Sequence, residues 1–476
     1  MALAKDDTVT TIGAGGKRVW LYPSWIRGKK LTARTIVHWV LLVLLLIGPW
    51  IDIGGHPATR IDIPGRRMYF WGATLMATDG AYMLFAAGLI VFSVFFFTAL
   101  FGRAWCGWSC PQTVFLESVI RPVERLIEGD AKARRKLDEG PWTGKKLVKK
   151  ALKYGFYLLF AGAIGTTFTA YFLGREGVIE AQLDPLAYPG GTATFLGITA
   201  LLLFDFAYFR EQTCIVVCPY GRFQSVLLDA DSLAVGYDER RGEPRGKVTD
   251  PAAGDCVDCK ACVRVCPTGI DIRKGPQMEC VQCMACIDAC DEVMVKLRRP
   301  TGLIRLDSER RLARQDSRSF AHRALRPRVL AYGLGLLGTL AVLIFAIGLR
   351  EPVGLDLHRM SGAPPYVALA DGRVQNSLEL RIQNRDAQTR AFRVSLVGDD
   401  GTELLVPGGE LIVEGEATRQ FPVFVLRPAA LGGGPVTLRV SDDQGFGDEV
   451  VIEFLASARP AVDTRTKLRQ RGGGEA

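Results

Sequence analysis

Five apolar windows, each about 20 residues long, constrain this 476-residue chain more than any other feature, because that length crosses a bilayer as a helix. They cover residues 34–53, 81–101, 151–173, 191–209 and 329–349. The first window follows more than thirty mostly polar and basic residues and has no small-residue cleavage site behind it. It therefore predicts a membrane anchor and not a secretory signal, and the five windows together predict a multi-pass membrane protein.

The distribution of Lys and Arg predicts the orientation, because positive charge near a helix end resists translocation. Basic residues gather in the N-terminal arm, in residues 103–150 and in residues 210–328, but not in residues 54–80 or 174–190. We therefore expect a bacterial inner-membrane protein with a cytoplasmic N-terminus and a periplasmic C-terminus. The net charge of +9 belongs to these flanks and not to an aromatic-interleaved basic patch, so no nucleic-acid partner is expected.

The C-terminal segment, residues 350–458, alternates apolar and polar side chains. Alternating runs begin at Ser377, Phe392, Phe421 and Val436, and glycine-rich turns separate them. This pattern predicts a small antiparallel β-sandwich. The segment has no cysteine and no conspicuous cluster of titratable residues, so we expect a docking or structural role. Residues 459–476 are expected to form a disordered tail.

Eight of the twelve cysteines form two tandem runs of the pattern Cys-x2-Cys-x2-Cys-x3-Cys. This spacing is typical of two-cluster ferredoxins, in which three thiolates of a run hold one 4Fe-4S cluster and the fourth ligates the other cluster. One cluster is therefore predicted on Cys256, Cys259, Cys262 and Cys290, and the second on Cys266, Cys280, Cys283 and Cys286.

Zinc is the alternative for these cysteines, but two structural zinc sites would not need tandem third and fourth cysteines at this spacing. Haem attachment is excluded because no Cys-x2-Cys pair is followed by His; the residues that follow are Lys260, Val263, Met284 and Ile287. Each 4Fe-4S cluster carries one electron at a time, so we expect a one-electron relay.

The remaining four cysteines belong to an internal repeat in which residues 101–115 align with residues 209–223. Each copy places Cys-x3-Cys-Pro just past the cytoplasmic end of a predicted hairpin, which suggests a parallel pseudo-two-fold with the motifs face to face. Four soft thiolates suit Cu(I) or another thiophilic site. The alternative is a set of buried small apolar side chains. The four residues are Cys106, Cys110, Cys214 and Cys218.

Three weaker patterns receive simpler interpretations. The Gly-x-Gly-x-x-Gly run from Gly333 lies inside the fifth window, where small residues serve helix packing and not dinucleotide binding. Asp205 falls within the fourth window and is either functional or paired with a nearby cation such as Arg210. The methionines Met68, Met76 and Met83 are expected to pack and not to admit copper.

Longer stretches around these motifs resemble the CcoG/FixG/RdxA cytochrome oxidase accessory proteins. The resemblance runs from about Trp25 to Arg310 and is carried by Trp105-Cys-Gly-Trp-Ser-Cys-Pro-Gln-Thr, Cys266-Pro-Thr-Gly-Ile-Asp-Ile-Arg, Glu279-Cys-Val-Gln-Cys-Met-Ala-Cys-Ile-Asp-Ala-Cys-Asp and the stretches that begin at Arg210 and Tyr237. It implies a five-helix transmembrane α bundle with a cytoplasmic two-cluster ferredoxin-like α+β domain and a periplasmic immunoglobulin-like β-sandwich.

The expected organisation follows the chain. An N-terminal arm (1–33) leads into a first hairpin (34–101), a cytoplasmic loop with the first Cys-x3-Cys-Pro (102–150), and a second hairpin (151–209). The cluster domain with the second Cys-x3-Cys-Pro (210–328), a fifth helix (329–349), the immunoglobulin-like domain (350–458) and the tail (459–476) complete it.

The resemblance further implies a cupric reductase, which supplies Cu(I) to P-type copper ATPases for assembly of cbb-type haem-copper oxidase. It extends a copper or redox role to Cys106, Cys110, Cys214 and Cys218. Two other functions remain open: an electron-transfer subunit that passes electrons from quinol or a soluble donor to a respiratory partner, and an assembly scaffold with structural clusters. The sequence shows no nucleotide or flavin site, so it does not identify the electron donor.

Overall fold

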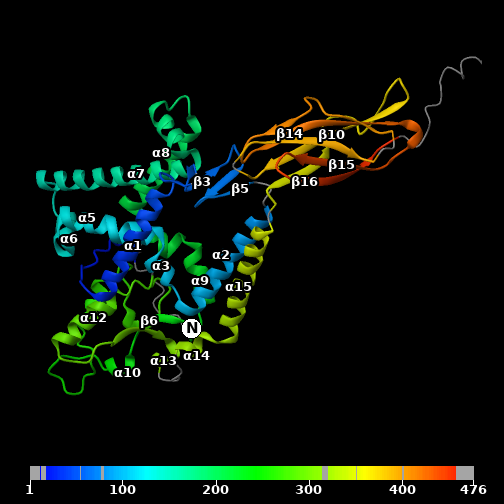
Figure 1. Ribbon diagram of the computed structural model, residues 1–476. Helices are drawn as coiled ribbons and strands as arrows, with labels where there is room; N and C mark the ends of the chain where they lie inside the picture. The colour runs from blue at the N-terminus through cyan, green and yellow to red at the C-terminus, as the bar shows by residue number, and fades with distance from the viewer. Residues whose placement is uncertain are drawn as a thin grey trace, which may run out of the picture. The chain divides into compact units, whose positions relative to one another are not determined.

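The computed structural model describes Thr11 and residues 18–53, 55–76, 80–313, 320–349, 351–386, 388–398 and 401–456 (Figure 1). The chain divides into two compact units, Met1–Ala346 and Ile347–Ala476. The tail expected at residues 459–476 lies outside the described residues.

Within the described residues, five helices are long and apolar enough to cross a membrane. They are α1 (Lys29–Ile47), α2 (Gly80–Phe101), α7 (Gly144–Leu183), α8 (Pro189–Phe204), which continues as the π-helical turn η3 (Asp205–Phe209), and α15 (Pro327–Gly348). The first window was expected to continue to residue 53, but α1 ends at Ile47 because Gly48 and Pro49 follow, and proline cannot continue a helix.

Helix α7 differs most from the sequence expectation, which placed a loop at residues 174–190. The helix instead continues to Leu183 across a kink at Gly174, whose φ of 76° lies in the left-handed region that favours glycine. The kink lets the chain bend without ending the helix, so most of the expected loop is helical. At its other end α7 begins at Gly144, because the basic residues before the apolar window are also good helix formers.

Small strands connect α1 to α2, in a segment where no strand was predicted. Strands β1 (Asp52–Ile53) and β2 (His56–Pro57) pair, and β3 (Thr59–Asp62), β4 (Arg67–Phe70) and β5 (Ala73–Met76) form an antiparallel sheet. Trp71 and Gly72, both at positive φ, make the two-residue turn between β4 and β5.

Helices α2 and α15 lie side by side (Figure 1) and meet through the glycines of the fifth span. A Cβ added at Gly335 would lie 2.5 Å from the Phe92 ring, and one at Gly333 would lie 3.2 Å from the Phe96 ring. These glycines thus serve helix packing, as their position inside an apolar window predicts.

The two copies of the repeat fold into short helical segments beside the span ends. The first copy gives α3 (Ala104–Trp108), α4 (Pro111–Phe115), the π-helical turn η2 (Leu116–Ile120) and α5 (Arg121–Glu128), before α6 (Ala131–Glu139). The second copy gives η3, the π-helical turn η4 (Thr213–Val217) and α9 (Pro219–Leu227).

The cysteine-rich domain is framed by a two-stranded antiparallel sheet of β6 (Leu233–Tyr237) and β7 (Ile304–Ser308). Between these strands lie α10 (Glu239–Gly242), α11 (Ala261–Arg264), the 3₁₀ turn η5 (Ile272–Lys274) and α12 (Ala285–Lys296). Helices α13 (Glu309–Leu312) and α14 (Phe320–Ala324) lead to the fifth span.

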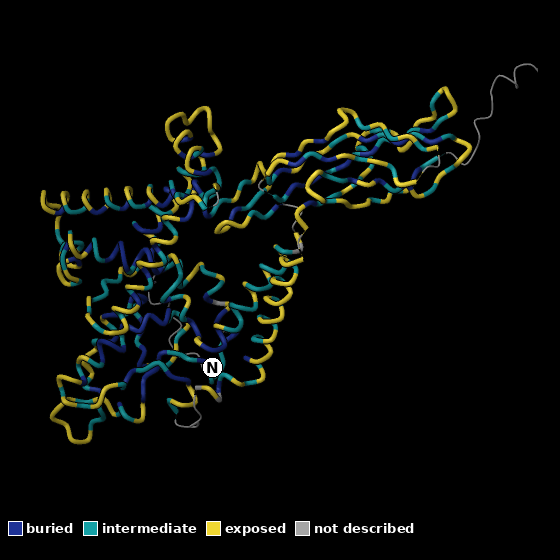
Figure 2. Tube along the Cα trace, in the orientation of Figure 1, coloured by how far each residue is buried: buried dark blue, intermediate teal, exposed yellow. Residues whose placement is uncertain are grey.

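The C-terminal unit is an antiparallel β-sandwich in its described residues, as the alternating pattern predicts. One sheet has the order β12-β14-β10-β8 with β9 beside β10, and the other has the order β13-β11-β15-β16. The strands are β8 (Val353–Arg359), β9 (Val367–Ala368), β10 (Arg373–Asn384), β11 (Arg390–Val397), β12 (Glu403–Leu405), β13 (Leu411–Val413), β14 (Thr418–Pro428), β15 (Gly434–Asp442) and β16 (Gly447–Phe454), with the 3₁₀ turn η6 (Ala429–Leu431) after β14. Every second residue of β10 is buried (Figure 2), and Leu378, Leu380 and Ile382 point into the core.

Candidate functional site

Four cysteines surround a cavity of about 350 Å³ in the cysteine-rich domain. Cys256, Cys259 and Cys262 come from the first run, and Cys290 comes from the end of the second run, on α12. Aliphatic side chains and the Met294 thioether complete the wall, so the cavity is apolar apart from its thiols, Tyr237, Lys260 and Arg273.

A second cavity of about 350 Å³ has the reciprocal composition. The cysteines that line it are three of the second run and the last two of the first run: Cys280, Cys283, Cys286, Cys266 and Cys262, which also lines the first cavity. Val235, Ile270 and Ile272 lie around them. The fourth cysteine of each run therefore lies at the other run's cavity, which is the arrangement that a two-cluster ferredoxin requires.

The two runs share a backbone conformation that the sequence did not reveal. The residue before and the residue after the second cysteine of each run have positive φ: 48° and 55° at Asp258 and Lys260, and 56° and 63° at Gln282 and Met284. Non-glycine residues in this region are uncommon and concentrate where function over-determines the backbone. Because these positive φ angles recur at equivalent positions, the two cysteine loops share one backbone conformation.

The chemistry of the lining fits an iron–sulfur cluster in each cavity. Burial raises the pKa of Cys262 to about 11 and those of Cys280 and Cys290 to about 12, so these thiols need the charge of bound iron to ionise. Trp108 packs against the same core as Cys266, Cys280 and Cys286, and its buried indole N–H has no hydrogen-bond partner among the described residues. Cluster sulfur would accept such a donor.

The two Cys-x3-Cys-Pro copies have similar backbones. Cys110 (φ −63°, ψ 126°) and Cys218 (φ −64°, ψ 108°) each precede a helix whose first residue is the proline of the motif. Cys106 lies in α3 and Cys214 in η4, one turn before these positions. Proline suits the first helical position because its missing N–H would have no intrahelical acceptor there.

The four thiols come from both copies of the repeat and lie close enough to shift one another's pKa. The Cys106 thiol donates to Gln224 Oε1 (3.1 Å), on the helix that Cys218 begins. Burial raises the pKa of Cys106 to about 11, and the Cys110 and Cys218 thiols add to the shift. Burial and the same neighbours also raise the pKa of Cys214. In the part of the chain that the structure describes, no three His, Cys, Asp or Glu side chains are already placed to hold one metal ion, and this applies equally to the two cavities.

This group of four thiols, which we call the thiol quartet, adjoins the second cavity. Cys106 and Cys214 pack against the apolar cluster that contains Cys283. A Cβ at Gly107 would lie 2.4 Å from the Val281 carbonyl oxygen and 3.0 Å from the Cys283 nitrogen, so α3 touches the cysteine loop directly. Only glycine permits this approach without moving one backbone.

Gln282 and His38 stabilise the contact between α3 and the cysteine loop, and neither was predicted from the sequence. Gln282 accepts from the Arg103 backbone N–H (2.7 Å) and donates to the Phe101 carbonyl (2.9 Å), which fixes the cysteine loop to the end of α2. His38 of α1 is buried and contacts Ser118 Oγ (2.7 Å) through Nδ1 and the Gly107 carbonyl (3.2 Å) through Nε2. Nε2 must donate to that carbonyl, which leaves Nδ1 to accept from the Ser118 hydroxyl in the neutral ring. Isolated residues of these types carry no sequence signal.

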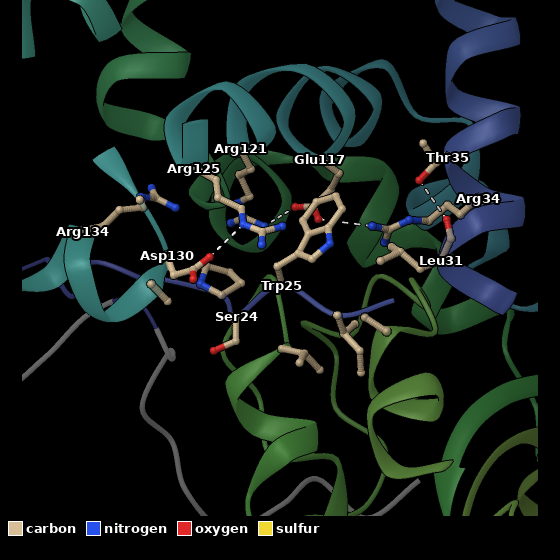
Figure 3. A pocket seen from close by; sticks show the side chains of 16 residues that line it. Ser24, Trp25, Leu31, Arg34, Thr35, Glu117, Arg121, Arg125, Asp130 and Arg134 are labelled. Atoms are coloured by element: carbon tan, nitrogen blue, oxygen red, sulfur yellow. Dashed lines mark hydrogen bonds and ion pairs between the residues drawn. The ribbon is translucent and has the colours of Figure 1, made fainter. Parts of the chain in front are cut away.

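A polar cavity of about 660 Å³ is lined mainly by the N-terminal arm, α1, α5 and the start of α6 (Figure 3). Arg34 of α1 and Arg121 of α5 both reach Glu117, with 3.3 Å between Arg34 Nη2 and Glu117 Oε2. Arg34 also donates to the Cys283 carbonyl (3.4 Å), and Arg125 pairs with Asp130 (2.8 Å). These ion pairs connect the first span and the first repeat to the second cavity.

A second ionic network is fully buried. Glu124 accepts from Arg210 (2.7 Å) and Arg134 (2.6 Å) and from the Tyr157 hydroxyl. Burial opposes ionisation of Glu124, but Arg210 and Arg134 outweigh it and lower its pKa to about 2. Arg210, offered as one possible cation partner of Asp205, donates its backbone N–H to the Asp205 carbonyl (2.8 Å), but its guanidinium pairs with Glu124.

Asp205 accepts instead from neutral donors. The Gln112 amide contacts both of its carboxylate oxygens (2.9 and 2.8 Å), and the Thr213 hydroxyl contacts one (2.7 Å). Gln112 follows Cys110 and Thr213 precedes Cys214, so this carboxylate connects the two copies of the repeat beside the thiol quartet.

Comparison with protein families finds iron–sulfur domains over both copies of the repeat. A 4Fe-4S dicluster domain matches residues 209–309, and a 4Fe-4S binding domain matches residues 83–129. The model described as an IG-like fold at the C-terminal of FixG matches residues 343–457. The comparisons thus agree with the cavities and with the sandwich.

Three curated relatives match across most of their length. Protein RdxA of Cereibacter sphaeroides is 35% identical over 96% of this chain and 95% of its own. Protein RdxB of the same organism is 35% identical over 85% of this chain and 87% of its own. The nitrogen fixation protein FixG of Rhizobium meliloti is 35% identical over 84% of this chain and 82% of its own.

Proposed function

Because the chain belongs to the family of RdxA, RdxB and FixG and is an iron–sulfur electron-transfer protein of the membrane, we propose that it reduces Cu(II) to Cu(I). The observation that carries this proposal is the convergence of the thiol quartet beside the second cysteine cavity.

The clusters bind in the two cavities. Cys256, Cys259, Cys262 and Cys290 hold one 4Fe-4S cluster, and Cys266, Cys280, Cys283 and Cys286 hold the other. When bound, each supplies one-electron redox chemistry at a low-dielectric position. The two cavities support this assignment, because the fourth cysteine of each run lines the cavity that contains the first three cysteines of the other run.

Copper is the substrate of the thiol quartet. Each Cu(II) ion takes up one electron and leaves as Cu(I), and soft thiolates favour the Cu(I) product. The quartet touches the Cys283 loop through Gly107, so the electron crosses few atoms. Without copper, the Cys106 thiol keeps its proton and donates it in a hydrogen bond to Gln224. Copper binding displaces that proton, because a bound metal ionises a thiol.

The reductase works on the cytoplasmic side of a bacterial inner membrane, with the sandwich in the periplasm. The span ends that contact the cysteine-rich domain support this: the α1 N-terminus donates to Asp288 through Leu31 N (2.8 Å), and Arg326 before α15 donates to the Ala99 carbonyl (2.9 Å). These ends have the Lys/Arg-rich flanks, which stay in the cytoplasm. The Cu(I) passes to a P-type copper ATPase for assembly of cbb-type oxidase.

Serine variants of the thiol quartet test the proposal. The protein is reduced with dithionite without oxygen, desalted, and mixed with Cu(II) and a Cu(I)-specific chelator. We expect wild-type protein to yield Cu(I) as the clusters reoxidise, and Cys106→Ser and Cys214→Ser to lose most of that rate while they keep cluster absorption. Val217→Ser, which adds the same hydroxyl to the same turn, is the matched control. Full copper reduction by a variant that combines Cys106→Ser with Cys214→Ser would overturn the role of the quartet.

A second function is favoured by the 4Fe-4S binding domain matched at residues 83–129, which contains Cys106 and Cys110. In it the quartet holds a third cluster, and the chain is an electron-transfer subunit without a copper substrate. Iron analysis separates the two: the copper proposal requires about eight irons per chain and the alternative about twelve, since each cluster has four.

A further inference from the structure

An apolar cavity of about 1520 Å³, including the part open to the surface, lies on the side of α3 that carries Trp105 and Trp108. Its wall is formed by the second half of α2, by Val37 of α1, by α3 and by Tyr220 and Gln224 of α9. Its outer rim is exposed: Ile90 is 66% exposed, Phe97 51% and Trp105 53%. Since α2 is an apolar span, this rim faces hydrocarbon in a membrane.

Polar groups gather at the inner end of this otherwise apolar space. The Gln224 amide donates to the Tyr220 hydroxyl (2.8 Å) and to Thr98 Oγ1 (3.3 Å). All three side chains line the cavity. A large apolar cavity with a few convergent polar groups is the usual form of a small-molecule site, in which the polar groups orient the ligand.

The same cavity adjoins the redox centre. Trp108 lines the cavity and also packs against the core that contains Cys266, Cys280 and Cys286. Gln224 both lines the cavity and accepts from the Cys106 thiol. A molecule in the cavity would therefore contact both Trp108, which packs against the cysteine-rich core, and Gln224, the partner of the Cys106 thiol.

We propose that this cavity is the binding site of a membrane quinol, which is the electron donor of the protein. An apolar ring and tail fit the hydrocarbon-facing wall, and the quinol hydroxyls meet Gln224, Tyr220 and Thr98. One quinol loses two electrons and two protons and becomes the quinone. Two oxidised clusters each take up one electron, and the two protons pass to water. This assignment rests on the proposed iron–sulfur function, and it identifies the electron donor to the two clusters.

A lipid acyl chain is the competing occupant, because it too would fill an apolar groove beside a span. An acyl chain has no group that could exchange hydrogen bonds with the polar side chains at the inner end of the cavity. A quinol head group can exchange hydrogen bonds with them, and there it lies beside Gln224, which also contacts the Cys106 thiol.

The test uses full-length protein in lipid nanodiscs. The quinol-site inhibitor 2-heptyl-4-hydroxyquinoline N-oxide is titrated by its own fluorescence, and decylubiquinol and menadiol are each added to the oxidised protein while cluster absorption is followed without oxygen. We expect stoichiometric inhibitor binding and cluster reduction. Ile90→Trp, which fills the rim, weakens inhibitor binding by about tenfold or more, or about 1.4 kcal/mol. Leu84→Trp, also exposed on α2 but outside the cavity, binds as wild type.

Several outcomes would overturn the proposal. Clusters that dithionite reduces but neither quinol reduces exclude the donor role, even if the inhibitor binds. Equal binding and reduction in Ile90→Trp and wild type exclude this cavity as the site, and the absence of inhibitor binding leaves lipid as its occupant. Failure of the copper reaction is separate, because it is measured on dithionite-reduced protein that has met no quinol.

Discussion

Gly107 lies at a close contact between α3, which carries Cys106, and the cysteine-rich domain. Its neighbours in sequence, Cys106 and Trp108, contact Gln224 and the cysteine core respectively. Both placements depend on the close approach of the α3 backbone to the Val281 carbonyl. The positions of Cys106 and Trp108 thus depend on a residue without a side chain.

Replacing Gly107 by Ala should separate α3 from the cysteine loop. The new Cβ would meet backbone atoms at 2.4 and 3.0 Å, and relief of such overpacking typically costs about 1–3 kcal/mol. We expect less iron in the second cavity and slower copper reduction, measured by iron analysis and by the EPR signal of the dithionite-reduced protein. Gly162→Ala, at a helical position with no atom of another segment within 4 Å, is the control and should keep full iron content.

In the sandwich, one buried ion pair gives a pH-dependent stability. The Asp442 side chain is 0% exposed and accepts from Arg390 (2.6 Å) and from the N–H groups of Gln444 (2.9 Å) and Phe446 (2.8 Å). Burial opposes ionisation of Asp442, but Arg390 and these N–H groups outweigh it and lower its pKa. A lowered carboxyl pKa stabilises the fold above the unfolded-state value of about 3.9, and the stabilisation is lost as pH falls through the folded value.

Asp442→Asn should therefore destabilise the sandwich at pH 7 by about 1–3 kcal/mol, the cost of a lost charged hydrogen bond. The deficit should shrink as the pH falls below about 4, because the wild-type carboxyl then also loses its charge. Chemical unfolding followed by circular dichroism from pH 7 to pH 3 measures both. Asp443→Asn, at the exposed neighbouring position, should match wild type throughout. A deficit that is independent of pH would contradict the ionic origin.

At the scale of elements, the close packing of α15 against α2 depends on Gly335, the glycine that lies against the Phe92 ring. Gly335→Leu should force α15 away from Phe92, whereas a Cβ added at Gly338 would have no atom within 4 Å, so Gly338→Leu should be tolerated. We expect Gly335→Leu to lower the thermal unfolding midpoint in detergent by an amount that corresponds to about 1–3 kcal/mol. Equal midpoints for the two variants would show that these helices do not pack as described.

Elements with a strong periodic or spacing signal could be predicted from the sequence, and elements that depend on tertiary context could not. Apolar length located the five spans, and alternation located the sandwich strands. The kink at Gly174 and the strands β3–β5 were not predicted, because a glycine or a short polar segment is equally compatible with a loop.

The candidate site shows the same division. Cysteine spacing predicted which thiols share a cavity, and the repeat predicted that the other four converge. Gln224, Trp108, His38 and Gln282 were missed because each contributes one contact from a distant segment. Only the fold brings such residues together.

At the scale of the whole molecule, the orientation proposal makes a separate prediction. Alkaline phosphatase, which folds only in the periplasm, should be active when fused after residue 456 and inactive when fused after residue 310. Green fluorescent protein exported in unfolded form should give the opposite pattern at the same two positions. The same activity at both junctions would contradict a single membrane crossing, by α15, between residues 310 and 456.

The central claim is that electrons stored in two clusters reduce copper, and stoichiometry tests it most directly. Fully reduced protein is mixed with excess Cu(II) and a Cu(I)-specific chelator in an anaerobic stopped-flow instrument. Cluster reoxidation and Cu(I) formation should follow the same time course and give about two Cu(I) per chain, because each cluster carries one electron. Clusters that stay reduced in the presence of Cu(II), or Cu(I) that forms without cluster reoxidation, would contradict it.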